Sequence, residues 1–137
     1  MSDPPRPAEP ARNAALVRIA VGPLVGPVLG RVVGMLAARA DCPVDRLDNA
    51  MVVVDALAAH AGARVAEDRV TVKVSTWDDA MELMVGPLED GGAEALLRDA
   101  ALPGVGNILE RVADAVRVER DPDSGAQRLA IRIAFAG

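Results

Sequence analysis

Two glycine-rich turns, each followed by a helix-forming segment, are the part of this sequence best suited to hold a ligand. Residues 81–114 predict a strand, a turn at Gly91-Gly92, a short helix, a second turn at residues 104–107 and another helix. The first N–H groups of a helix are unpaired and carry partial positive charge, and glycine lets the backbone approach a bound group. The arrangement fits a phosphate group, although the same turns also serve as ordinary connections.

Asp55 and His60 are the notable polar residues of a helix predicted for residues 43–62. The stretch from Ala50 to Ala59 is almost entirely apolar, as in the most buried helix of a domain. Asp55 either faces solvent or is buried and paired with an arginine. His60 either lies capped or solvated at the end of the helix, or faces a ligand.

The composition argues against several kinds of chemistry. Cys42 is the only cysteine and His60 the only histidine, which removes disulfides, cysteine-based metal sites and most serine–histidine sites. We therefore expect no metal site. A net charge of −5 argues against non-specific binding to nucleic acid. The longest apolar stretch, residues 14–38, contains arginine and proline, so we expect no membrane helix and a cytoplasmic protein.

The chain divides into a tail and one domain. Residues 1–13 are rich in proline and carry charges of both signs, so we expect a disordered tail. They lack the apolar run of a signal peptide. Residues 14–137 are long enough for a single domain with a real core. Because Trp77 and Phe135 are the only aromatic residues, that core must consist of Val, Leu, Ile, Met and Ala.

The hydrophobic pattern predicts the element order β-α-α-β-β-α-α-β-β. Each predicted strand has one apolar and one polar face, which a sheet covered by helices on one side explains. We therefore expect a two-layer α/β sandwich with a mostly antiparallel five-stranded sheet and helices on one face. The predicted strands span residues 15–21, 69–75, 81–85, 116–119 and 128–135, and the predicted helices span 24–40, 43–62, 91–100 and 105–114.

Glycine recurs every four residues in the predicted helix 24–40. Gly26, Gly30 and Gly34 would form a smooth stripe on it. Each interior glycine costs ~1 kcal/mol relative to alanine, so close packing should offset the stripe. That packing is either inside the domain or against a partner helix or a second copy. We expect the buried side of this helix to carry Val28, Val32, Met35 and Leu36.

Residues 103–116, together with the element order, resemble a known family. Pro103-Gly104-Val105-Gly106-Asn107 opens a helix that ends at Ala113-Asp114 before a strand, and an Asp-Ser-Gly turn and an apolar strand follow. The pattern is similar to the histidine-kinase-like ATPase (GHKL, or Bergerat) domain. The closest branch is the bacterial anti-sigma factors with serine-protein-kinase activity. The composition, rich in Ala, Arg and Val, resembles high-GC actinobacterial members.

The resemblance implies a degenerate nucleotide pocket. In the family a helix carries a Glu that activates water or a substrate hydroxyl, then an Asn that holds Mg²⁺, and an Asp after the third strand binds adenine. Here Ala56, His60 and Gly86 stand in those places. We expect no catalytic residues, no kinase or ATPase activity, no required cofactor and at most residual binding of ATP with Mg²⁺. The candidates for residual nucleotide binding are Asp55, His60, Gly104, Gly106 and Asn107.

Three functions remain open from the sequence. The first is a regulatory protein that captures a sigma factor or an anti-anti-sigma protein. The second is an active ATP-dependent serine-protein kinase of the same family. The third is a structural or dimerisation module without a ligand. In each case we expect no direct contact with nucleic acid or membrane.

Basic residues gather on the predicted outward face of the sheet, although the whole chain is acidic. This face is either ordinary solvated surface paired with Glu82 and Glu119, or a docking surface for an acidic partner or for a second copy in a homodimer. Ala20, Ala130 and Ala134 would let a partner come close. The candidate partner-binding residues are Arg18, Lys73, Arg128 and Arg132, with Arg69 and Arg117 on the same face.

Overall fold

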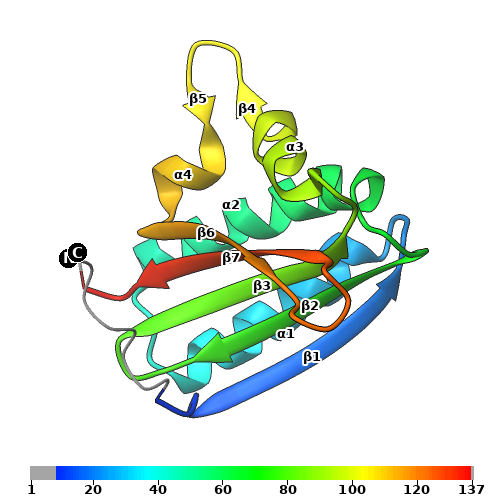
Figure 1. The fold of residues 1–137 in the computed structure, drawn as a ribbon. Coiled ribbons are helices and arrows are strands. Elements are labelled where there is room, and N and C mark those ends of the chain that lie inside the picture. Colours follow the sequence, from blue (N-terminus) through cyan, green and yellow to red (C-terminus); the bar gives the residue numbers. More distant parts are fainter. Residues whose placement is uncertain (1–8, 137) are drawn as a thin grey trace, which may run out of the picture.

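The computed structural model describes residues 9–136 as one sheet with helices packed on one side (Figure 1). The main sheet has five strands in the order β1-β2-β3-β7-β6, and all neighbouring strands are antiparallel. The predicted two-layer α/β sandwich is therefore confirmed. Across the described residues, no helix combines the length and apolar character that a membrane span requires.

The chain forms these elements in order. They are β1 (Asn13–Ala20), α1 (Val25–Arg39), α2 (Val44–His60), the 3₁₀ helix η1 (Ala61–Ala63), β2 (Arg69–Thr76), β3 (Ala80–Leu88), α3 (Gly92–Asp99), β4 (Ala101–Leu102), β5 (Gly106–Asn107), α4 (Ile108–Val112), β6 (Ala115–Arg120) and β7 (Gln127–Ala134).

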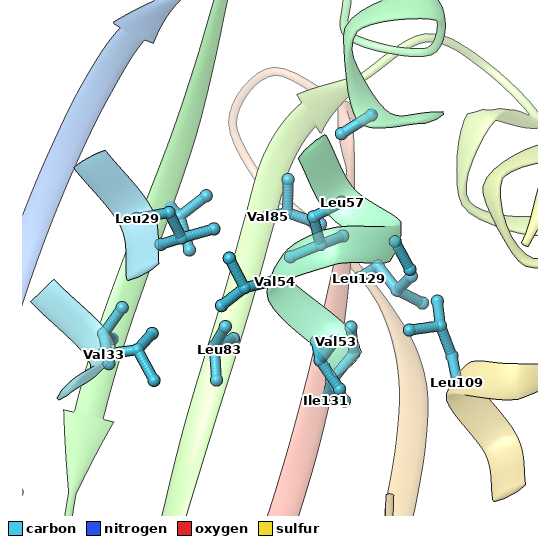
Figure 2. Packing of buried hydrophobic residues seen from close by; sticks show 14 of the residues in the cluster. Leu29, Val33, Val53, Val54, Leu57, Leu83, Val85, Leu109, Leu129 and Ile131 are labelled. Carbon is cyan, nitrogen blue, oxygen red and sulfur yellow. The ribbon is translucent and has the colours of Figure 1, made fainter. Parts of the chain in front are cut away.

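The core lies between the sheet and the two long helices. Strand side chains alternate between the two faces, so every second residue points at the helices. Figure 2 shows side chains of α1 and α2, among them Leu29, Val54 and Leu57, pointing at this apolar face. Fully burying one Val, Leu or Ile side chain contributes about 1.5–3 kcal/mol. The buried inward side chains of the central strands are Val70, Val72, Val74, Met81, Leu83, Val85, Leu129, Ile131 and Ile133.

The glycine stripe of α1 packs against α2 inside the domain. A Cβ built on Gly26 would lie 3.3 Å from the Cβ of Ala58, and one on Gly30 would lie 3.9 Å from Cγ1 of Val54. Gly34 faces the same helix. Of the two predicted uses of the stripe, the structure therefore shows packing within the domain.

The predicted buried side of α1 is wrong. Met35 is 66 % exposed and Val28 38 % exposed, while Val32 and Leu36 pack only partly against the core. The helix is apolar around most of its circumference, so the spacing of its apolar residues fits more than one face. The buried positions are Val25, Leu29, Val33 and Ala37.

The helix predicted for residues 105–114 is wrong at both ends. α4 spans only Ile108–Val112, and the residues before it form the small hairpin of β4 and β5. Gly104 and Gly106 have φ angles of +77° and +86°. These left-handed conformations cannot continue a right-handed helix, so the helix starts after them.

The stripe offers a matched pair of substitutions. Gly30→Ala places its Cβ at an ordinary contact distance of 3.9 Å from α2, so we expect the free energy of unfolding to rise by about 0.5–1 kcal/mol through helix propensity. Gly26→Ala places its Cβ only 3.3 Å from Ala58, so the helices must shift and the gain should be smaller or absent. Urea unfolding measures both values. Equal gains at the two positions would contradict close packing at Gly26.

Candidate functional site

The two nucleotide candidates on α2 do not face a common space. Asp55 is exposed, whereas Ala56 is buried and His60 is half-buried. Residues five apart on a helix point about 140° away from each other. Asp55 therefore faces solvent, which was one of its two alternatives. The charge of His60 makes a minor contribution to the lowered pKa of Asp99 in α3, after the larger effect of Arg64.

Gly104, Gly106 and Asn107 lie together at the β4–β5 hairpin. The glycines lie in the exposed part of the hairpin, and Asn107 precedes α4. Its Oδ1 accepts the backbone N–H groups of Leu109 at 3.0 Å and Glu110 at 3.3 Å. Its Nδ2 donates to a backbone carbonyl of α3 at 2.9 Å. The side chain amide is thus used to cap α4 and to join it to α3.

An apolar side chain fills the side of the core where α4 meets α2. Leu109 is fully buried, and Figure 2 shows it reaching from α4 toward Leu129 of β7. The short helix is held to the domain by this side chain and by the cap of Asn107. The glycine turn and the helix after it therefore act as a connection that places Leu109 in the core.

A side chain at position 86 would point away from α2, to the opposite face of the sheet. A Cβ on Gly86 would lie 2.8 Å from Cγ of Arg128, whose side chain is on the outward face. The inward neighbour, Val85, is buried in the core. Because adjacent strand residues face opposite sides, Gly86 cannot share a pocket with Ala56 and His60.

Arg64 joins the end of α2 to α3. Its Nε donates to Asp99 Oδ2 at 2.7 Å, and a terminal nitrogen donates to Oδ1 at 3.2 Å. A further bond reaches Glu89 at 3.4 Å. The hydrogen bond from Arg64 lowers the pKa of Asp99 and raises the pKa of the guanidinium. These bonds are partly exposed, so they fix the position of α3 more than they add stability.

The second candidate site is the open face of the main sheet. No helix of the described chain lies over it, and the β6–β7 turn folds in front of it (Figure 1). Three carboxylates of this face are engaged in ion pairs. Arg117 donates to both oxygens of Glu82, at 3.1 and 3.3 Å, and to Glu119 at 2.7 Å. Arg18 pairs with Glu67 at 3.0 Å.

Most cations of the open face form no ion pair. In the part of the chain that the structure describes, this holds for Arg69, Lys73, Arg128 and Arg132. The Nε atom of Arg128 is buried and has no hydrogen-bond partner among residues 9–136. Arg132 lies over the ring of Trp77, 5.1 Å from its centroid, a favourable cation–π arrangement. Of the alternatives predicted for this face, pairing with Glu82 and Glu119 accounts only for Arg117.

A groove of about 600 Å³ lies between this face and the β6–β7 turn; we call it the open-face groove. Asp121 of the turn accepts backbone N–H groups of Asp123 and Ser124, which lowers its pKa, with a smaller effect from the charge of Arg128. The carboxylate of Asp121 is thus held by its own turn. The lining residues are Leu16, Ala66, Glu67, Thr71, Lys73, Met84, Gly86, Pro87, Asp121, Ser124, Ala126 and Arg128.

A short N-terminal segment lies beside the groove. Residues 1–8 of the predicted tail lie outside the described residues, but Glu9–Arg12 are described, and β1 begins at Asn13. Nε1 of Trp77 donates to the backbone carbonyl of Glu9 at 3.0 Å. Residues 9–11 line a second hollow on the open face, which shares Lys73 and Met84 with the groove.

Sequence reasoning missed several residues of this surface. Leu16 and Met84 were not singled out, although both stand at outward positions of amphipathic strands, where an apolar residue is unexpected. The sequence pattern gave Trp77 no role on this surface. Its being the only tryptophan of the chain was the available signal.

Comparison with known proteins adds no family assignment. No protein-family model matches the chain, and no curated protein has significant sequence similarity to it. Within residues 9–136, no group of three or more His, Cys, Asp or Glu side chains is arranged to hold a metal ion.

The lowered pKa of Asp99 predicts an acid-dependent loss of stability. Its contribution is fully present above the unfolded carboxyl pKa of about 3.9 and is lost as the pH falls through the lower folded value. We expect Asp99→Asn to flatten the fall in the free energy of unfolding between about pH 4 and pH 2. Asp55→Asn, at an exposed position, is the matched control. Urea unfolding at several pH values in this range measures the effect. If the free energy of unfolding of Asp99→Asn falls with pH as steeply as that of the wild type, the role of Arg64 is contradicted.

Proposed function

We propose that this protein is a regulatory binding protein that resembles anti-sigma factors and captures a sigma factor or an anti-anti-sigma protein. One observation carries the proposal. The three positions matched to the family's Glu, Asn and Asp hold a buried alanine at 56, a half-buried histidine at 60, and a glycine at 86 whose Cβ position is on the opposite face of the sheet. They are dispersed and poor in functional groups.

Phosphoryl transfer depends on the placement of charge around Mg²⁺ and the phosphate groups. The methyl group of Ala56 can neither move a proton nor bind a cation. The amide of Asn107 is already used in capping α4. Binding of a protein partner requires none of these groups. The open face is an exposed surface with cations that form no ion pair in the described chain. A partner of this kind implies a cytoplasmic location, which we propose as well.

The kinase and the inert module are the competing functions, and two assays separate them. We expect no hydrolysis of ATP, no phosphate transfer to proteins of the native cell, and binding of Mg-ATP weaker than micromolar by isothermal titration. A dissociation constant near 1 μM, equivalent to about −8 kcal/mol, would contradict the proposal and favour the kinase.

Partner capture is the second assay. The full chain, immobilised and exposed to lysate of its native cell, should retain a sigma factor or an anti-anti-sigma protein. Asp55→Arg, which changes the charge of an exposed residue on α2, serves as a matched bait because the substitution lies away from the open face. If neither kind of protein is retained at low salt, the inert module becomes the better account.

A further inference from the structure

We propose that the open-face groove binds an extended, acidic segment of the partner protein. This inference rests on the proposed function and names the chemistry of the partner. The groove combines cations that form no ion pair in the described chain with an apolar floor, and it adjoins a hollow lined by residues 9–11.

Charge is the first argument. Lys73 is exposed and Arg128 half-buried, and neither has an ion-pair partner in the described chain, whereas Glu67 and Asp121 are held by Arg18 and by the β6–β7 turn. A carboxylate in the groove would meet cations with little competition from acidic neighbours. Hydrogen bonds between a guanidinium and a carboxylate are among the stronger ones in proteins.

The position of Arg128 is the second argument. Its stem lies directly against Gly86, where a Cβ would come within 2.8 Å of Cγ. The absence of a side chain at Gly86 thus lets the arginine lie along β3 at the wall of the groove. Its buried Nε has no partner among residues 9–136, and leaving such a group unpaired is costly. The half-buried guanidinium lines the groove, so a ligand carboxylate would meet its positive charge there.

The shape of the floor is the third argument. Leu16, Lys73 and Met84 stand side by side on β1, β2 and β3. Leu16 is 67 % exposed, so the floor offers apolar contact next to positive charge. Glu9–Ala11 lie on the adjoining part of the same face, fixed by Trp77. A segment that presents both carboxylate and apolar side chains therefore matches the groove.

A second copy of the chain is the less suitable occupant. A two-fold symmetric contact would place the same basic surface on both sides of the interface. The uncompensated cations would then face each other, which is unfavourable.

The test uses the full chain and a short synthetic peptide of alternating glutamate and leucine at neutral pH. Its control is the same peptide with glutamine in place of glutamate. Amide chemical shifts locate the site, and the emission of Trp77, the only tryptophan, gives a second signal. We expect the acidic peptide to shift Leu16, Thr71 and Gly86, and the glutamine peptide to bind far more weakly.

Two pairs of variants sharpen the result. Lys73→Glu lies in the groove, and Arg31→Glu makes the same change of charge at an exposed position of α1. Leu16→Glu lies in the groove, and Leu24→Glu changes a leucine of similar exposure, 61 % against 67 %. We expect each groove variant to weaken peptide binding about tenfold, equivalent to 1.4 kcal/mol, and each control to bind like wild type.

Several outcomes would overturn the inference. These are equal binding of the glutamine peptide, shifts confined to another surface, or Lys73→Glu binding as tightly as Arg31→Glu. We expect the wild type not to self-associate in sedimentation through this groove. If it does, and Lys73→Glu abolishes the self-association, the occupant is a second copy and the inference is overturned. If the groove variants still capture the cellular partner, the groove is not the docking site while the proposed function stands. Tight binding of Mg-ATP would instead remove the proposed function, whatever the peptide does.

Discussion

Close contact between α1 and α2 allows both helices to cover the same face of the main sheet, and the rest of the structure depends on it. Three glycines of α1 face α2, and the nearest built Cβ contact is only 3.3 Å, between Gly26 and Ala58. The two helices therefore bury the inward valines, leucines and isoleucines of the central strands without aromatic residues. One consequence is that the other face of the sheet must remain compatible with water on its own, which it achieves through arginine–carboxylate pairs such as Arg117 with Glu82.

The two faces of the sheet consequently differ in what they can do. On the helix side, polar groups serve the fold: the nucleotide candidate Asn107 caps α4, and Arg64 holds Asp99 of α3. On the open face, arginine and lysine outnumber the carboxylates that could neutralise them. Lys73, Arg128 and Arg132 remain without an ion pair in the described chain, so this face retains a local positive charge within an acidic protein. Such a surface accelerates and orients association with acidic partners more than it stabilises the fold.

The strands of the main sheet and their buried face could be predicted from the sequence. Apolar and polar residues alternate in these strands, which leaves one choice of buried face. The failures have separate physical causes. α1 is apolar on several sides, so its buried face depends on where α2 lies. The residues before α4 form a hairpin because Gly104 and Gly106 adopt positive φ angles, and a glycine turn before a helix has the same appearance in sequence. The groove depends on strand register, which brings Leu16 beside Lys73 and Met84 from distant parts of the chain. No local pattern contains that information.

Hydrogen–deuterium exchange of the complex between the full chain and its captured cellular partner tests most directly whether the open face is the working surface. Protection on binding should concentrate in β1, β2 and the β6–β7 turn, which border the open-face groove. The β4–β5 hairpin and α4 should exchange as they do in the free protein. Protection confined to that hairpin and α4, with unchanged exchange in β1 and β2, would contradict the account. The partner would then bind on the helix side of the sheet.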